Sequence, residues 1–112
     1  MGDTPPERLR ERIADDEILV LPGAYDALSA RLAERAGFDA AFTSGFSIAA
    51  TKLGLPDMGM LTMAENVERA GTVAGAIDVP LVADMDTGYG NVLNVRRTMQ
   101  ECVDARIAGV IL

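Results

Sequence analysis

A chain of 112 residues, of which 49% are hydrophobic and 24% are charged, has the composition of one small folded domain and not of a disordered or fibrous protein. Its formal net charge of -7 argues against a nucleic-acid partner and against an anionic membrane surface, because acidic surfaces repel phosphate groups. No apolar run approaches the roughly 20 residues of a membrane span, and the first residues lack the apolar segment of a secretory signal, so we expect a cytoplasmic protein without membrane contact.

The first residues of the chain predict a helix followed by a strand. Thr4 and Glu7 have the spacing of a capping box. Leu9 and Ile13 follow one turn apart, which completes the pattern of a short amphipathic helix. The continuous apolar run at 18–21 ends at a Pro-Gly pair, and such a run predicts a strand that is buried on both faces.

The middle of the chain predicts a helix, a strand and a long connection. Apolar residues at helical spacing predict a helix over residues 26–36, with Asp26 as its N-cap. A strand is predicted at 39–43. Glycines and a proline are spread through residues 44–61, which predicts a long loop that contains one short helix around 47–52. Long loops of this kind are often functional.

The remaining residues repeat the alternation of helix and strand. A second capping-box pattern begins a helix that is predicted over residues 62–76. The third strand is predicted at 79–83. Either Asn91 or Asn94 can cap the next helix, and residues 109–112 predict the start of a fourth strand.

This order of elements predicts the fold class. Strands that alternate with helices form βαβ units, and their right-handed crossovers give a parallel sheet with helices outside it. Neither a Gly-x-Gly-x-x-Gly turn nor a phosphate loop is present, whereas a (β/α)8 barrel fits the order. A complete barrel needs about 250 residues. We therefore expect residues 1–112 to form a single domain that is the N-terminal half of a (β/α)8 barrel, with the C-terminal half absent.

Two aspartates, Asp84 and Asp86, follow the third predicted strand. Side chains at positions i and i+2 of a strand share one face, and the carboxyl ends of parallel strands form the catalytic face of a barrel. A few carboxylates with water completing the octahedron suit Mg2+. A polar turn with an Asx cap explains the same spacing about as well, but the position directly after a buried strand favours a metal site.

A second group of candidate residues follows the second predicted strand. Residues 43–47 pass from that strand into a short helix, so their amide N–H groups can point toward an anion such as a carboxylate. The Ser44 hydroxyl would add a donor, and Gly45 would let a ligand approach the backbone closely. An ordinary turn of small residues explains the same pattern. Asp57, further along the loop, can face the cation or cap a turn.

Residue types that often carry catalysis are scarce in this chain. There is no His, and the single cysteine, Cys102, can form no internal disulfide. Any bound metal would therefore be a hard cation held by oxygen. Cys102 lies on the apolar stripe of a predicted helix, which favours packing over nucleophilic catalysis. Tyr25 and Tyr89 both follow strands, and each can either donate to a substrate oxygen or lie at the surface.

Four segments of the chain, taken in order, closely resemble the isocitrate lyase and phosphoenolpyruvate mutase superfamily. They are PGAYDA at 22–27, TSGFS at 43–47, LGLPD at 53–57 and DMDTGYGN at 84–91. The resemblance implies a (β/α)8 barrel, homotetramers, and Mg2+ that holds an α-keto or α-hydroxy carboxylate. The residues that the resemblance assigns are the metal ligands Asp84 and Asp86, partly through water, the substrate-binding residues Ser44, Gly45 and Phe46, and the supporting catalytic residue Asp57.

Within that superfamily, the LGLPD segment is more similar to lyases of methylisocitrate and other 2-substituted malates, and to their oxaloacetate-cleaving relatives, than to the phosphonate-forming mutases. Phe46 and Ser47 depart from the glycine-rich turn of methylisocitrate lyases and resemble the petal-death-protein type of malate lyase. The implied activity is Mg2+-dependent cleavage of a carbon–carbon bond in a small di- or tricarboxylate, through an enolate intermediate.

Two alternatives stay open at this point. One is a carboxyphosphonoenolpyruvate or phosphoenolpyruvate mutase, or an oxaloacetate hydrolase or decarboxylase, of the same superfamily. The other is a non-catalytic half barrel that associates through its open sheet edges. In the lyases the general-acid cysteine lies on a Lys-x-Cys-Gly-His loop, and these 112 residues contain no such motif. We therefore expect the 112-residue chain alone to be inactive.

Overall fold

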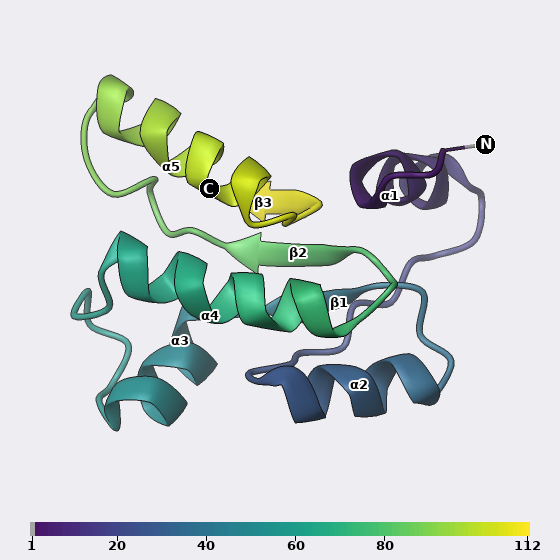
Figure 1. Ribbon diagram of the computed structural model, residues 1–112, viewed down its shortest axis with the longest axis horizontal. Coiled ribbons are helices and arrows are strands. Elements are labelled where there is room, and N and C mark those ends of the chain that lie inside the picture. The colour runs from purple at the N-terminus through teal and green to yellow at the C-terminus, as the bar shows by residue number, and fades with distance from the viewer. Residues whose placement is uncertain (1) are drawn as a thin grey trace.

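The computed structural model describes residues 2–112, in which three strands pair in parallel in the order β1-β2-β3. Ala41 lies opposite Leu81, and Val82 lies opposite Gly109. The elements in chain order are α1 (Pro5–Ala14), α2 (Ala27–Arg35), β1 (Ala41–Thr43), α3 (Gly45–Ile48), the π-helical segment η1 (Ala49–Leu53), α4 (Met63–Ala76), β2 (Leu81–Asp84), α5 (Val92–Asp104) and β3 (Gly109–Ile111) (Figure 1). None of these helices is both long and apolar enough to cross a membrane.

Side-chain caps fix where the longer helices begin. At the start of α4, the Glu65 amide donates to Thr62 Oγ1 over 3.2 Å, and the Thr62 amide donates to Glu65 Oε1 over 3.0 Å. A cap of this kind typically contributes about 1 kcal/mol to stability. The predicted helix starts are confirmed, and each pairs the N-cap residue with the residue three positions on: Thr4 with Glu7, Asp26 with Ser29, Thr62 with Glu65, and Asn91 with Asn94.

The core lies between one face of the sheet and the helices α2, α4 and α5. Because side chains alternate along a strand, every second strand residue faces these helices. Small side chains such as Ala30 and Ala70, both fully buried, let the helices approach one another and the sheet. Cys102 is only 2% exposed and packs in this core, which confirms its predicted packing role. The buried cluster comprises Ala24, Ala30, Ala41, Val67, Ala70, Val73, Ile77, Leu81, Ala83, Met85, Cys102 and Ile107.

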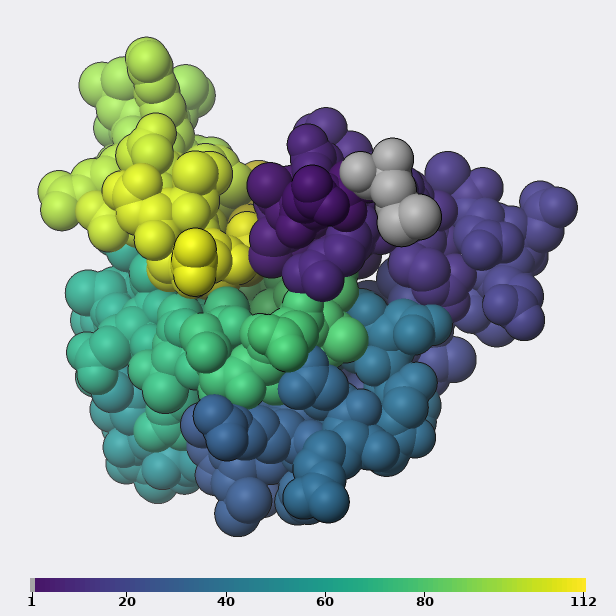
Figure 2. Space-filling view, turned by 45° about the vertical axis from the view of Figure 1, so that its right-hand side comes forward, coloured from purple at the N-terminus to yellow at the C-terminus, as the bar shows by residue number. Residues whose placement is uncertain are grey.

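Helix α1 covers the end of the sheet at which the strands begin. The Arg8 guanidinium donates to the carbonyl oxygen of Asp78, which lies in the turn before β2. Leu9 is buried against the start of β3, where a Cβ on Gly109 would lie 2.8 Å from Leu9 Cδ2. Figure 2 shows α1, in dark purple, against the yellow C-terminal residues. The opposite end of the sheet, where the strands end, is left to the connecting loops.

The strand that we predicted at 18–21 is wrong. In the structure this end of the chain makes a single parallel bridge, between Gly23 and Phe42, and Ile18 is 85% exposed. The register explains the difference: continued backward from this bridge, residues 18–21 fall opposite 37–40, which form the turn after α2 rather than a strand. An apolar run needs a partner strand for its backbone hydrogen bonds, and β1 begins too late to supply one.

Candidate functional site

Three aspartates and one glycine meet at the carboxyl ends of β1 and β2. Gly45 begins α3 directly after β1, Asp84 ends β2, Asp86 follows it, and Asp57 lies in the connection from η1 to α4. A Cβ on Gly45 would lie 3.6 Å from Asp86 Oδ1, 3.7 Å from Asp57 Oδ1 and 3.9 Å from Asp84 Oδ2. Carboxylates predicted from separate motifs therefore face one backbone position, and glycine at 45 leaves the space between them open.

The loop geometry, and not strand alternation, brings Asp84 and Asp86 together. Asp86 lies beyond the end of β2 and has a φ of 50°, in the left-handed region that only a few per cent of non-glycine residues adopt. Its amide donates to Asp84 Oδ1 over 3.0 Å, which orients the first carboxylate relative to the second. Tyr89 also has a positive φ of 66°. Strained backbone of this kind clusters at functional sites.

The charges of the three carboxylates are not compensated by basic side chains. Burial raises the pKa of the Asp86 carboxyl above its ordinary value, and the negative charges of Asp84 and Asp57 raise it further. The neighbouring Tyr89 hydroxyl opposes this rise in the pKa of Asp86, because it can donate toward the carboxylate. The ion pairs within residues 2–112 involve none of the three aspartates. A bound cation would relieve this repulsion.

Two buried side chains hold the loop from the helix side, and the sequence analysis missed both. Asn66 of α4, fully buried, donates from Nδ2 to the Asp84 carbonyl oxygen over 2.9 Å and to Tyr89 Oη over 2.8 Å. Thr98 of α5, 1% exposed, donates to the Gly88 carbonyl oxygen over 2.8 Å. The signal in the sequence was a polar residue on an otherwise apolar stripe of α4.

The two tyrosines have different environments. Burial raises the pKa of Tyr89 to about 12, so its hydroxyl keeps its proton at neutral pH. This hydroxyl faces inward, where it meets Asn66 and Asp86. Tyr25 is 44% exposed, which matches the surface alternative. Of the two, Tyr89 is therefore the one that belongs to the site.

The substrate-binding residues that we predicted have unequal positions. Gly45 is buried among the carboxylates. Ser44 is the N-cap of α3: its Oγ accepts from the Ser47 amide over 3.2 Å and lies 2.9 Å from Ser47 Oγ. The Phe46 side chain is 65% exposed. The structure thus brings Gly45 to the aspartates, whereas the Ser44 hydroxyl is engaged in the cap and the Phe46 ring lies at the surface.

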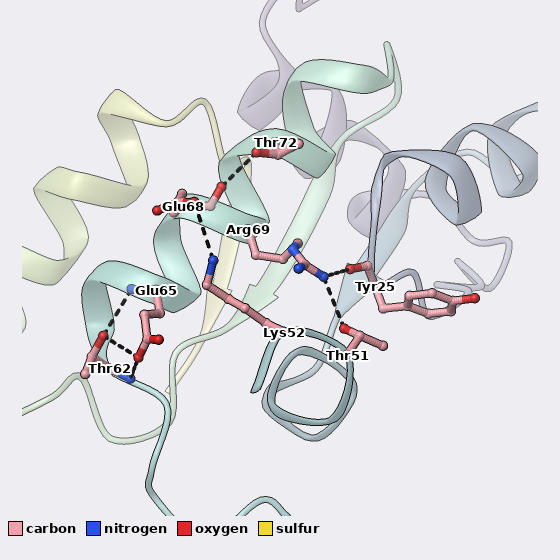
Figure 3. Close-up of polar contacts among 8 residues, drawn as sticks. All are labelled: Tyr25, Thr51, Lys52, Thr62, Glu65, Glu68, Arg69 and Thr72. Carbon is pink, nitrogen blue, oxygen red and sulfur yellow. Dashed lines mark hydrogen bonds and ion pairs between the residues drawn. The ribbon is translucent and has the colours of Figure 1, made fainter. Parts of the chain in front are cut away.

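Helix α4 also anchors the segment that follows Gly45 (Figure 3). Arg69 Nη1 donates to the Tyr25 carbonyl oxygen over 2.9 Å and to Thr51 Oγ1 over 3.1 Å. One residue earlier, Glu68 accepts from Lys52 Nζ over 3.4 Å. Both Thr51 and Lys52 belong to η1. One turn of α4 therefore contacts both segments. Glu68 and Arg69 contact η1, and Asn66 contacts the loop of residues 84–89, which we call the aspartate loop.

The donor set fits a hard divalent cation. All of the candidate ligand atoms are carboxylate oxygens, the hard ligands that Mg2+ takes. Within residues 2–112, no three Asp, Glu, His or Cys side chains are arranged to hold a metal ion by themselves. Water or substrate oxygens would have to complete the coordination, and Mg2+ ordinarily retains several waters. The residues present thus suit Mg2+ better than a cation that needs a complete protein cage.

Surface shape does not locate this site. A groove of about 440 Å³ lies at the opposite end of the molecule, between α1 and the ends of α4 and α5. Pro5, Arg8, Ile77 and Val103 are among its lining residues, and none of the three aspartates lines it. The convergence of carboxylates on Gly45 is therefore the stronger indication of function.

Comparisons with known proteins agree with this placement of the fold. A family model described as Phosphoenolpyruvate phosphomutase matches residues 9–112. The 2,3-dimethylmalate lyase of Eubacterium barkeri is 44% identical over 105 residues, which are 94% of this chain and 36% of that protein. The 2-methylisocitrate lyase of Bacillus subtilis (strain 168) is 47% identical over 103 residues, which are 92% of this chain and 34% of that protein. The chain spans about a third of the length of these curated relatives.

A solved structure extends the agreement to three dimensions. Phosphonopyruvate hydrolase in complex with oxalate and Mg2+ matches with a TM-score of 0.92 and 31% sequence identity. The match covers 97% of this chain and 38% of that structure. The predicted α/β fold, the N-terminal half of a (β/α)8 barrel with parallel strands, is thereby confirmed.

Proposed function

Because this chain belongs to the phosphoenolpyruvate phosphomutase family, within the isocitrate lyase and phosphoenolpyruvate mutase superfamily, we propose that the whole protein is a Mg2+-dependent carbon–carbon lyase. Its substrate would be a 2-substituted malate or a methylisocitrate-like carboxylate, cleaved through an enolate. The convergence of Asp57, Asp84 and Asp86 on Gly45 carries this proposal. The two lyase relatives, at 44% and 47% identity, support the reaction class.

Each site residue has a role in this proposal. Asp84 and Asp86 hold Mg2+, partly through water, and Asp57 lines the site beside them. When bound, Mg2+ supplies electrostatic stabilisation of the negative charge that develops on the substrate oxygen. Gly45 leaves room for the substrate between the carboxylates. Ser44 and Phe46 join it in binding substrate oxygens, and because the Ser44 hydroxyl is engaged in the cap, we assign this binding to backbone amides.

The proton donor of the reaction lies outside this site. Cys102 is the only thiol in the chain, and it is buried in the core on α5 rather than beside the aspartates. Burial also raises the pKa of its thiol, which disfavours proton transfer at neutral pH. We therefore propose that residues 1–112 supply the cation and substrate oxygens with their ligands, and that the 112-residue chain alone releases no product.

A second candidate is a phosphonate-processing enzyme of the same superfamily. The similarity to phosphonopyruvate hydrolase favours it, and so does the name of the matching family. A complete barrel that contains these residues would distinguish the two reactions. We expect pyruvate, glyoxylate or another keto acid from a 2-substituted malate or methylisocitrate. Phosphate release from phosphonopyruvate with no cleavage of malates would favour the second candidate instead.

We further propose that the complete protein is a homotetramer in the cytoplasm that acts on small carboxylates and binds neither nucleic acid nor membrane. The net charge of -7 supports the last two points. Sedimentation of the complete protein tests the assembly. Association of the 112-residue chain without any metal binding would favour the non-catalytic half barrel.

The metal site can be tested on the 112-residue chain by titration with Mn2+, followed by electron paramagnetic resonance. Asp84→Asn removes one proposed ligand charge. Asp16→Asn is the matched control, because Asp16 is exposed and makes none of the ion pairs found in residues 2–112. We expect Asp84→Asn to abolish or strongly weaken binding and the control to retain it. Equal affinity in the two variants would contradict the metal assignment.

A further inference from the structure

We propose that Asn66 is a positioning residue: from inside α4 it fixes the loop 84–89, and so sets how Asp84 and Asp86 are presented to a cation. This inference rests on the proposed function, because a fixed loop geometry matters for function only if the two aspartates bind a cation. It concerns a residue that does not itself reach the carboxylate cluster.

The position of Asn66 in α4 is unusual for an amide. Asn66, Ala70 and Val73 are spaced by four and three residues, so they share one face of the helix. All three are fully buried. Burying an amide costs free energy unless its polar atoms find partners. The partners that Asn66 has found therefore indicate what the residue does.

The Asn66 amide nitrogen directs its two hydrogens at the aspartate loop, residues 84–89. Its acceptors are the Asp84 carbonyl oxygen at 2.9 Å, Tyr89 Oη at 2.8 Å and, more weakly, Met85 Sδ at 3.6 Å. The backbone carbonyl can only accept, so the nitrogen of the side chain must face it. The orientation of the amide is thereby fixed. Residues at the two ends of the loop 84–89 are held by one nitrogen atom.

The contact with Tyr89 extends the hold to the second aspartate. Because Tyr89 Oη accepts a hydrogen bond from Asn66, its own proton is available to donate elsewhere. The Tyr89 hydroxyl lies beside the Asp86 carboxyl, to which that proton can be directed. Asn66 thus reaches Asp84 through the backbone and Asp86 through Tyr89. The amide of Asp86 closes the arrangement by donating to Asp84 Oδ1.

The remaining polar atom of Asn66 argues against a purely stabilising role. Its Oδ1 is buried and accepts no hydrogen bond from the protein atoms of residues 2–112. A leucine would fill similar space without burying that oxygen. The loop, in contrast, gains support that it needs, because Asp86 and Tyr89 both have positive φ values that surrounding contacts must maintain. The hydrogen bonds of Asn66 therefore stabilise the geometry of the loop rather than the helix or the core.

The first test uses the metal-free chain. Hydrogen exchange is measured by NMR for Asn66→Leu, which removes the amide, and for Val73→Ala. Val73 is the matched control: it is fully buried on the same face of α4, and its apolar side chain makes no hydrogen bond to the loop. We expect Asn66→Leu to reduce protection at the amides of Asp86 and Gly88 selectively, with α4 and β2 unchanged. Unchanged protection of the loop, or a uniform loss that the control shares, would overturn the proposal.

The second test is the Mn2+ affinity of the same variants. Substitution of a residue that orients a metal ligand typically weakens affinity about 10- to 100-fold, and we expect this loss for Asn66→Leu and for Asn66→Asp, which keeps the shape but loses the donors. Val73→Ala should bind as the parent does. Because Tyr89 transmits part of the effect, Tyr89→Phe should weaken Mn2+ binding less when it is added to Asn66→Leu than when it is made in the parent chain. Full additivity of the two substitutions would overturn the route through Tyr89.

The two measurements separate failure of this inference from failure of the proposed function. If the parent binds no Mn2+, or Asp84→Asn binds as well as the parent, the metal site is wrong, and hydrogen exchange still decides whether Asn66 fixes the loop. If Asp84→Asn loses Mn2+ while Asn66→Leu keeps the parent affinity, the metal site stands and the positioning role is overturned.

Discussion

Replacing Gly88 by alanine should destabilise the chain through two separate physical effects. Gly88 has a φ of 92°, and a Cβ there would lie 2.6 Å from Val95 Cγ2. Val95 cannot easily turn away, because a β-branched side chain in a helix has one strongly preferred rotamer. Overpacking typically costs about 1 to 3 kcal/mol, and a left-handed backbone adds about 1 to 2 kcal/mol for a residue with a Cβ. Together they predict a loss of about 2 to 5 kcal/mol.

Two other glycines separate these effects. Gly54 also has a positive φ, of 65°, but has nothing within 4 Å of its added Cβ, so Gly54→Ala should show the backbone cost alone. Gly75 lies within α4 with ordinary helical backbone and open space around it. Gly75→Ala should therefore stabilise the chain by about 0.5 to 1 kcal/mol, because alanine is the better helix former. The expected order of stability is Gly75→Ala, parent, Gly54→Ala, Gly88→Ala.

Thermal and urea denaturation, followed by circular dichroism, measure this series. For a domain of this size, 1 kcal/mol shifts the Tm by about 4 °C or more, so the variants should be resolved from one another. Adding Val95→Ala to Gly88→Ala removes the two closest contacts and leaves only Val95 Cβ, at 3.2 Å, so the cost of the glycine substitution should fall close to that of Gly54→Ala. If Gly88→Ala alone is no less stable than Gly54→Ala, the contact with Val95 does not constrain the loop and the reasoning is refuted.

Three further predictions concern caps and anchors. Hydrogen bonds from Thr62 lower the pKa of the Glu65 carboxyl in the folded chain. The stability that this carboxylate contributes is therefore present above its unfolded pKa and is lost as the pH falls through its folded pKa. Glu65→Gln should accordingly lose less stability than the parent in an acid titration followed by circular dichroism. Asn91→Ala removes the cap of α5 and should lower the free energy of unfolding by about 1 kcal/mol in urea, and no change would mean that the cap is dispensable. Arg69→Ala should increase proteolytic cleavage at residues 49–57. Lys52→Ala, which breaks only an ion pair to the exposed Glu68, should not. Equal cleavage of the two variants would contradict the anchoring role of Arg69.

The parts of the fold that depend on neighbouring residues were the most predictable. A capping box needs only residues three positions apart, so the start of α4 at Thr62 could be predicted from the sequence. A strand needs a partner that is distant in sequence. The apolar run at 18–21 has the composition of a strand, but its register places it opposite a turn. Hydrophobic pattern alone does not contain that information.

The candidate site shows the same division. The position of Asp84 at the end of β2 follows from the apolar run before it. The convergence of Asp57 with it does not follow from any spacing, because contacts of η1 with α4 hold the intervening loop. Asn66 was missed because one asparagine on an apolar stripe carries no signal of its partner. The contact of Asn66 with the Asp84 carbonyl oxygen depends on how β2 and α4 pack against each other.

The arrangement of contacts along α4 constrains how this protein can change its length. Asn66 faces the aspartate loop, and Glu68 and Arg69, within the next turn, face η1. One residue inserted between them would rotate everything beyond it by about 100° about the helix axis, so the two sets of anchors could no longer be satisfied together. Insertions should accordingly be tolerated at the exposed residues 58–60, beyond Asp57, and should disrupt the site when they fall between Asn66 and Arg69.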